Sequence, residues 1–178
     1  IEIFADPQNE NVAYVLAPPM LKTIDGGKTW QVMETMHGDH HGLWINPKNS
    51  KNMILADDGG AVISFNGGET WSFYNSNLTH NLKDVNFISD NIGFITGEYG
   101  TLLKTTDGGT TWEAMHLSFS NGAFNSVEVI DENNLIVVGD AGSVFLSNDG
   151  GNSWYGPNGV MYETNFNDVV FFTANDGI

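Results

Sequence analysis

Short apolar runs alternate with clusters of glycine, asparagine and aspartate along the whole chain. Within the runs, apolar and polar positions alternate, or the run is continuously apolar, as in strands buried on one or both faces. No segment keeps the 3.6-residue apolar period of an amphipathic helix over about 11 residues. The pattern therefore predicts an all-β chain with essentially no helix.

The runs fall into groups of four, and each group ends at a tryptophan followed by a short apolar segment. Strands are expected over 43–47, 53–56, 61–65 and 71–74, over 84–88, 92–97, 101–105 and 112–115, and over 125–130, 135–138, 143–146 and 154–155. Each group predicts one four-stranded antiparallel sheet.

An octet recurs four times at a nearly constant spacing. Its copies are Thr23-Ile-Asp-Gly-Gly-Lys-Thr-Trp30, Ser64-Phe-Asn-Gly-Gly-Glu-Thr-Trp71, Thr105-Thr-Asp-Gly-Gly-Thr-Thr-Trp112 and Ser147-Asn-Asp-Gly-Gly-Asn-Ser-Trp154, with tryptophans 41, 41 and 42 residues apart. Asp or Asn before Gly-Gly supplies a side-chain acceptor and positive φ, so the octet predicts a hairpin turn. The hydroxyl residues can bind the same turn, and the tryptophan can start the next strand and anchor the hairpin to the core.

These octets resemble the Asp-box, or BNR, repeat of β-propellers, and a 40- to 45-residue repeat of four strands is typical of a propeller blade. We expect one propeller segment over 1–178, with blades at about 1–35, 36–77, 78–118 and 119–160. Residues 161–178 repeat the start of a blade, so the first strand of a fifth is expected. We therefore expect part of a larger ring, completed by a longer chain or by a second copy. The alternative is a closed four-bladed ring, which would leave the extra strand unexplained.

Two varieties of the repeat are visible. The first half carries Asp6-Pro-Gln-Asn9, Asn46-Pro-Lys-Asn49 and a histidine-rich loop, and it resembles sortilin-type and xyloglucanase-type propellers. The stretch from Val85 to Gly109 is similar to the photosystem II assembly and stability factor family. Gly97-Glu-Tyr-Gly100 and Gly139-Asp-Ala-Gly142 recur at one blade position, which indicates turns between strands.

The charge balance excludes several classes of partner. Lys and Arg together number 6 against 22 Asp and Glu, giving a net charge of −16, and all six basic residues are lysines. Nucleic-acid binding needs a basic footprint, and a membrane span needs about 18 apolar residues in a row, so neither is expected. Sialidases with this repeat grip their substrate's carboxylate with arginines, which disfavours that activity here. Cysteine is absent, so thiol chemistry and disulfides are excluded.

The octet residues are interpreted as structural. Their Asp or Asn side chains recur once per blade around the rim, whereas the two carboxyl groups of a glycosidase must converge to within about 5–10 Å. This structural set comprises Asp25, Trp30, Asn66, Trp71, Asp107, Trp112, Asp149 and Trp154.

One loop outside the octets, Met36-His-Gly-Asp-His-His-Gly42, contains three histidines and an aspartate within five residues. His37, Asp39 and His41 are candidate ligands for a divalent cation, and the xyloglucanase-like and sortilin-like families carry an H-x-D-x-H stretch here. Asp39 with Asp57 or Asp58 is the candidate catalytic pair. The alternative is a polar loop whose histidines only bind turn groups. No cofactor is required.

We therefore expect a non-catalytic, acidic propeller scaffold that binds a protein or glycan partner through one face, outside the cytoplasm (secreted or periplasmic). The alternative is a xyloglucanase-type polysaccharide hydrolase that uses the Asp pair. Two carboxylates facing each other across a cleft would favour the hydrolase, and a flat or closed face would favour the scaffold.

Overall fold

The computed structural model describes residues 1–35, 38–57, 60–74, 80–117, 122–156, 164–173 and 176–177. The chain divides into two compact units, Ile1–Asn81 and Leu82–Ile178. In the described part the chain is all-β apart from two three-residue 3₁₀ turns, and it has no helix long and apolar enough to cross a bilayer.

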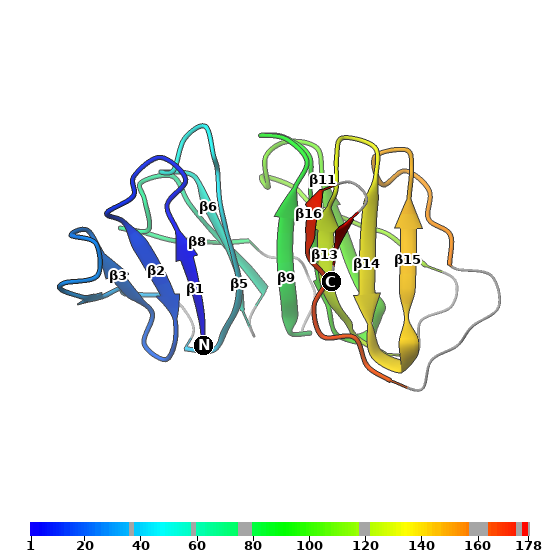
Figure 1. The fold of residues 1–178 in the computed structure, drawn as a ribbon, viewed down its shortest axis with the longest axis horizontal. Coiled ribbons are helices and arrows are strands. Elements are labelled where there is room, and N and C mark those ends of the chain that lie inside the picture. The colour runs from blue at the N-terminus through cyan, green and yellow to red at the C-terminus, as the bar shows by residue number, and fades with distance from the viewer. Residues whose placement is uncertain are drawn as a thin grey trace. The chain divides into compact units, whose positions relative to one another are not determined.

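The first unit contains two four-stranded antiparallel sheets, each ordered as in the sequence. The first sheet is formed by β1 (Glu2–Ala5), β2 (Ala13–Leu16), β3 (Leu21–Thr23) and β4 (Gln31–Val32). The second is formed by β5 (His40–Ile45), β6 (Met53–Asp57), β7 (Gly60–Ser64) and β8 (Ser72–Tyr74). Figure 1 shows strands β1, β2 and β3 in order across the first sheet.

The second unit repeats this arrangement. One sheet is formed by β9 (Leu82–Phe87), β10 (Gly93–Gly97), β11 (Thr101–Thr105) and β12 (Glu113–Ala114). The next is formed by β13 (Phe124–Val129), β14 (Leu135–Gly139) and β15 (Val144–Ser147) (Figure 1). Two short strands, β16 (Phe171–Thr173) and β17 (Asp176–Gly177), pair separately.

Most expected strands are present, and three details differ. The fourth strand expected over 154–155 is only an isolated bridge between Leu146 and Tyr155. Strands β8 and β12 begin one residue after their tryptophan, within the usual uncertainty of strand ends. The start of the fifth repeat holds two short strands where one was expected.

Each unit has its own apolar core between successive sheets. In the first unit the core joins Tyr14, Leu16 and Met20 to Leu43, Met53 and Leu55. In the second, Phe94 and Leu102 pack with Phe124, Val137 and Phe145. Alternate residues of β2 enter the first core, because neighbouring side chains of a strand point to opposite faces. In β13 the core residues Phe124 and Val127 are three positions apart, because the pairing shifts by one residue between them.

Lysines reach from the third strand of one sheet to the octet turn of the next. Lys22 Nζ donates to Gly67 O at 3.0 Å and lies 5.3 Å from the ring centre of Tyr14. Lys104 Nζ donates to Gly150 O at 3.2 Å and lies 5.6 Å from the ring centre of Phe94. Sheets within a unit are therefore linked by polar contacts as well as by the core.

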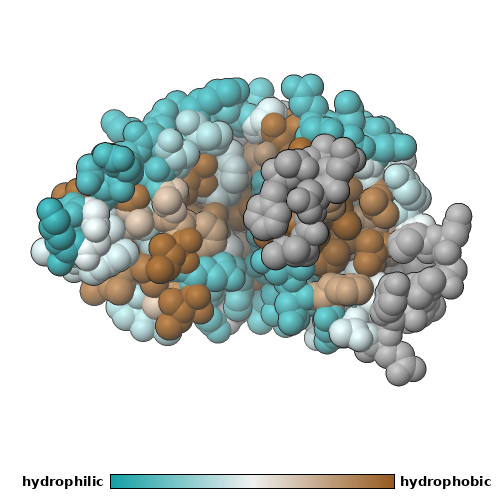
Figure 2. Space-filling model, viewed as in Figure 1, coloured by the Kyte–Doolittle hydropathy of each residue, from teal (hydrophilic) through white to brown (hydrophobic). Residues whose placement is uncertain are grey.

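The expectation that all four octet tryptophans pack in the core is wrong for Trp30, which is 40% exposed. The octet turn of one sheet packs on the sheet before it: a Cβ at Gly68 would collide with Met33, and one at Gly151 would collide with Phe94. Apolar side chains also reach the surface of the first unit (Figure 2). Ile3 is 70% exposed and Val32 is 65% exposed.

Candidate functional site

The side chains of each octet form hydrogen bonds within their own turn. Asp25 Oδ1 accepts the Thr29 backbone N–H at 2.9 Å, and Oδ2 accepts the Thr29 hydroxyl at 2.6 Å. Thr23 Oγ1 donates to Asp25 at 2.9 Å and accepts the Gly27 N–H at 3.0 Å. These bonds, led by the one from the Thr29 hydroxyl, lower the pKa of Asp25 to about 2.

The other copies repeat the geometry. Asn66, Asp107 and Asp149 each accept a backbone N–H four residues on, at 3.0, 2.8 and 2.9 Å. At Asn66 the amide Nδ2 donates to the Thr70 hydroxyl at 2.8 Å, which reverses the polarity of that one bond. The Asp149 pKa is also lowered to about 2, mainly by the Ser153 hydroxyl. These groups are occupied within their turns.

Two octet tryptophans in the second unit have defined ring contacts. Trp112 meets Phe87 edge-on with ring centres 6.0 Å apart, and Trp154 meets Phe94 edge-on at 5.9 Å. Aromatic pairs in this geometry add to the packing of the rings.

The histidine loop is only partly described. His37 and Asp58 lie outside the described residues, and Asp39 is exposed. His40 Nε2 lies 3.0 Å from Thr35 Oγ1, and the backbone of His40 pairs with that of Asp57 across β5 and β6. No group of three His, Asp or Glu side chains suited to a metal ion occurs among the described residues. The cation site and the Asp pair stay predictions.

A β-bulge recurs in β5, β9 and β13, each of which is the first strand of its sheet; these three are called the inner strands below. His41, Lys83 and Asn125 are each the extra residue in the first strand of their sheets, where the pairing with the second strand shifts by one. These residues are 42 positions apart, and Asn167 follows after the same interval. A bulge turns a side chain away from the regular alternation of the strand and is frequent beside functional sites.

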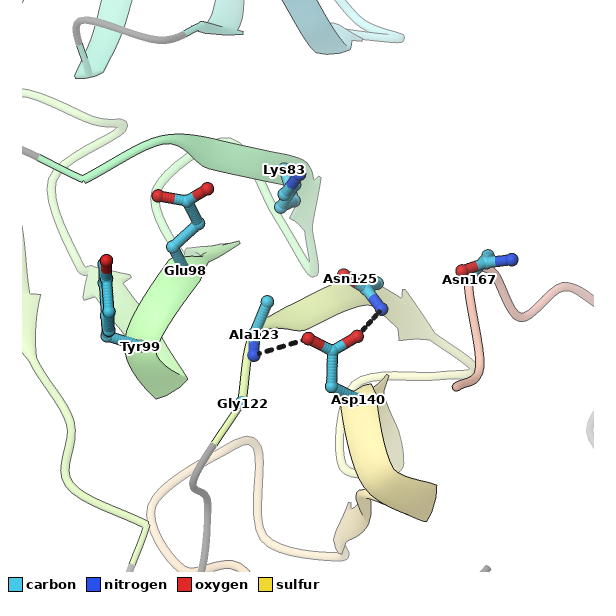
Figure 3. Close-up of a pocket in the computed structure, with 8 residues that line it drawn as sticks. All are labelled: Lys83, Glu98, Tyr99, Gly122, Ala123, Asn125, Asp140 and Asn167. Atoms are coloured by element: carbon cyan, nitrogen blue, oxygen red, sulfur yellow. Dashed lines mark hydrogen bonds between the residues drawn. The ribbon is translucent and has the colours of Figure 1, made fainter. Parts of the chain in front are cut away.

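Two of these bulge residues line a polar cavity of about 350 Å³ in the second unit. Figure 3 shows Lys83 and Glu98 on one side, and Asn125, Asp140 and Asn167 on the other. The remaining lining residues are Tyr99, Gly122 and Ala123. The cavity thus combines one ammonium, two carboxyl groups, two amides and a phenol.

Asp140 organises one wall of the cavity. Its Oδ1 accepts Asn125 Nδ2 at 3.1 Å, and its Oδ2 accepts the Ala123 N–H at 3.1 Å (Figure 3). Asn125 Nδ2 also donates to Phe166 O at 2.8 Å, which ties this wall to the segment that carries Asn167. A carboxylate has lone pairs left after two such bonds, so it can still accept a donor from a ligand.

Tyr99 stands at the rim on the 3₁₀ turn η1 (Glu98–Gly100) and is 78% exposed. Its φ of 55° lies in the left-handed region, which a bulky residue adopts at a cost. The matching turn η2 (Asp140–Gly142) has Ala141 at this position with φ 52°. The turn therefore does not need an aromatic ring, although Tyr99 places one at the cavity rim.

The residues that follow Lys83, Asn125 and Asn167 in sequence are Asp84, Ser126 and Asp168, and their side chains form a hydrogen-bonded row. Ser126 Oγ lies 3.0 Å from Asp84 Oδ2 and 3.0 Å from Asp168 Oδ1. Asp84 Oδ2 also accepts the Val127 N–H at 3.0 Å, which links β9 to β13. Burial is the largest influence on Asp84 and raises its pKa, and the charge of Asp168 acts in the same direction.

A second polar link runs along the same strands. Asn86 Nδ2 donates to Glu128 Oε2 at 3.0 Å, and Phe171 N–H donates to Glu128 Oε1 at 3.4 Å. Burial raises the pKa of Glu128, with contributions from the charges of Asp84 and Asp168. Side chains of the inner strands therefore hold β9, β13 and the segment leading into β16 together.

The sequence predictions included none of the residues that line the cavity. Two signals were available: the interval of 42 residues that relates Lys83, Asn125 and Asn167, and the two Gly-x-x-Gly turns. Neither shows by itself that the strand is bulged, because the bulge depends on how two strands pair.

Comparison with known proteins gives two groups of relatives. A family model described as "Photosynthesis system II assembly factor YCF48" matches residues 63–131. The photosystem II assembly lipoprotein Ycf48 of Prochlorococcus marinus (strain NATL2A) is 34% identical over 67 residues, 37% of this chain and 20% of that protein. The solved structure of an ancestral GH74 enzyme is similar at TM-score 0.76 and 18% identity, over 86% of this chain and 23% of that one.

A structure titled "YCF48 bound to D1 peptide" is similar at TM-score 0.51 and 13% identity, over 99% of this chain and 86% of that one. The sheets described here are thus β-propeller blades built from BNR-type repeats, and the chain resembles both the Ycf48 group and the GH74 propellers. It spans 20% of the length of the curated relative and 23% of the GH74 chain.

Proposed function

We propose that this chain forms part of a non-catalytic propeller scaffold that binds a protein partner through the cavity bounded by Lys83, Tyr99, Asn125 and Asp140. The observation that carries the proposal is that most of the cavity lies within residues 63–131, the stretch that matches the assembly-factor model. A similar structure holds a peptide, which supports a polypeptide as the ligand.

The cavity chemistry suits an extended peptide. Main-chain amides need both donors and acceptors, and the cavity offers Lys83 and Asn167 together with Asp140 and Glu98. The exposed Tyr99 ring adds apolar contact area with few rotatable bonds, a property of residues that dominate binding energy at interfaces. The location proposed is extracytoplasmic, since the curated relative is named a lipoprotein.

The test uses a random peptide library displayed on phage, with the D1 peptide as a defined probe. Peptides selected on the intact chain are measured by fluorescence anisotropy against the wild type, Tyr99→Ala and Tyr155→Ala. Tyr155 is a matched control because it is also exposed, at 49%, and lies outside the cavity. We expect Tyr99→Ala to weaken binding tenfold or more, about 1.4 kcal/mol or more, and Tyr155→Ala to leave it unchanged.

Equal affinity in all three proteins would place binding elsewhere, and a library that yields no binder would contradict a peptide-binding role. Both variants change exposed side chains, so circular dichroism should show the same fold in each.

The second candidate function is polysaccharide hydrolysis, with Asp39 and Asp57 or Asp58 as the acid pair. It is favoured by the pairing of His40 with Asp57, which brings the end of β6 beside the residue that follows Asp39. Release of reducing ends from xyloglucan by the wild type, abolished in Asp39→Asn, would support it. No release above buffer would leave the scaffold proposal as the better account.

A further inference from the structure

Ser126 stands between the carboxyl groups of Asp84 and Asp168 and has one hydroxyl hydrogen to share between them. Ser126 Oγ is 3.0 Å from an oxygen of Asp84 and 3.0 Å from an oxygen of Asp168, yet a hydroxyl carries a single hydrogen. It can donate to one carboxylate, and its lone pairs then face the other. A proton on one carboxyl group completes the chain, because that group donates to Ser126 Oγ while Ser126 donates onward.

The charges around this chain favour holding that proton. The groups facing Asp84 from the neighbouring elements are Asp168, on the segment before β16, and Glu128 on β13, and both are acidic. On β10 the residue paired with Asp84 is Thr96, which carries no charge. Lys83 precedes Asp84 on β9 and lines the cavity. Asp84 is the member whose burial disfavours ionisation.

The cavity and the proton chain are built on the same three segments: β9, β13 and the residues just before β16. Each member of the chain follows a cavity residue directly in sequence: Asp84 follows Lys83, Ser126 follows Asn125, and Asp168 follows Asn167. Two ionised carboxylates on either side of one hydroxyl repel each other across a short path, whereas the protonated chain draws them together. A change in this repulsion would act on β9, β13 and the segment before β16, which also carry the cavity residues Lys83, Asn125 and Asn167.

We propose that one proton shared between Asp84 and Asp168 through Ser126 sets the width of the cavity, which makes the cavity a pH-regulated binding site. The proposal deepens the function given above and rests on it only for the identity of the ligand. Below the transition the strands are held together and the cavity has one width, and above it the strands separate and ligand affinity changes severalfold.

The test needs no ligand. Carboxyl carbons of Asp84 and Asp168 and side-chain amides of Asn125 and Asn167 are followed by NMR as the pH is raised in the full chain. We expect Asp84 to titrate above the ordinary aspartate range, and the two amide signals to shift with the same midpoint. In Asp84→Asn, which keeps a donor toward Ser126 and cannot ionise, the amide signals should no longer move over that range.

A stability measurement checks the sign. Because the folded state holds the proton more tightly than the unfolded chain, the contribution of Asp84 is present at low pH and is lost as the pH rises through its folded pKa. The melting temperature of Asp84→Asn should therefore rise relative to wild type as the pH increases. Glu132→Gln removes a charge at an exposed site and should show no such pH-dependent gain.

Several results would overturn the inference. It fails if both carboxyl groups ionise in the ordinary aspartate range, or if Asp84 titrates high while the Asn125 and Asn167 amides stay still. Should Asp84→Asn not fold, Asp168→Asn at an exposed position gives the same decision, because removing that charge should lower the midpoint of Asp84. Failure of peptide binding would leave all of these readouts intact, so the two proposals are tested separately.

Discussion

At the residue scale, the acceptor of the octet turn matters for its geometry more than for its charge. Asp107 accepts the Thr111 N–H at 2.8 Å and its hydroxyl at 2.6 Å, while Asn66 holds the equivalent turn with the same backbone bond and a reversed hydroxyl bond. A neutral side chain therefore satisfies the turn. What the turn requires is an oxygen at this distance from a backbone N–H four residues on.

Replacing Asp107 should separate these contributions. Asp107→Ala removes the side-chain oxygens that accept the Thr111 N–H and hydroxyl, and we expect it to lower the free energy of unfolding by about 1–2 kcal/mol. Asp107→Asn restores the arrangement seen at Asn66 and should recover most of that loss. Urea unfolding measures both, and peptide affinity should be unchanged in each. An alanine variant with wild-type stability and weaker binding would show that the octet has a binding role.

Acid should weaken the turns within a defined range. The pKa of Asp25 and that of Asp149 are lowered to about 2 in the folded state, mainly by the hydroxyls of Thr29 and Ser153. A lowered folded pKa gives stability that is present above the unfolded value near 3.9 and lost as the pH falls through about 2. Carboxyl-carbon NMR should find both midpoints well below the ordinary aspartate value of about 3.9. Ordinary midpoints at Asp25 and Asp149 would mean that the hydroxyl bonds do not persist in solution.

At the element scale, the value of an octet tryptophan depends on the sheet that precedes it. Trp112 is partly buried against Phe87, whereas Trp30 is 40% exposed. Truncating a packed aromatic ring removes its contacts and leaves a cavity, while truncating an exposed ring costs much less.

We expect Trp112→Ala to cost about 3 kcal/mol and Trp30→Ala less than about 1 kcal/mol. The comparison is matched because both residues close the same octet. Denaturant unfolding gives the two free energies, and acrylamide quenching of single-tryptophan variants gives the exposure independently. Similar losses at the two sites would mean that the first sheet is covered in solution.

The repeating elements could be predicted from the sequence because strands and turns are local. The octets and the alternation of apolar residues placed most strands of the described sheets to within a residue or two, as at 101–105. The bulges at Lys83 and Asn125 could not be predicted, since a bulge is a property of the pairing between β9 and β10 or between β13 and β14. The cavity depends on those bulges, so its residues were missed together.

The prediction of a fourth strand beside β15 was wrong for a related reason. Tyr155 forms only one bridge to Leu146, although its octet matches the others in sequence. A two-residue outer strand such as β12 depends on a few pairings with its neighbour. Whether so short a segment is a strand or a bridge is decided by the pairing and not by its composition.

At the scale of the whole molecule, the charge is strongly one-sided. The net charge is −16 over 178 residues, with six lysines and no arginine. Two of the lysines, Lys22 and Lys104, donate to octet turns of the neighbouring sheet. Because acidic residues outnumber lysines 22 to 6, the compact state bears a net repulsion that the expanded chain relieves.

Screening should therefore stabilise the fold. Raising the ionic strength from about 0.01 to 0.15 M shortens the Debye length from about 30 to 8 Å, which weakens repulsion between exposed carboxylates more than bonds within the turns. We expect the melting temperature to rise by about 2–4 °C, corresponding to about 1 kcal/mol for a chain of this size. A triple variant, Glu10→Gln with Glu69→Gln and Glu132→Gln, removes three exposed charges and should melt higher than wild type at low salt while gaining less from added salt. Differential scanning calorimetry in sodium chloride measures both proteins, and a melting temperature that falls with salt in the wild type would show that attractive ion pairs outweigh the repulsion.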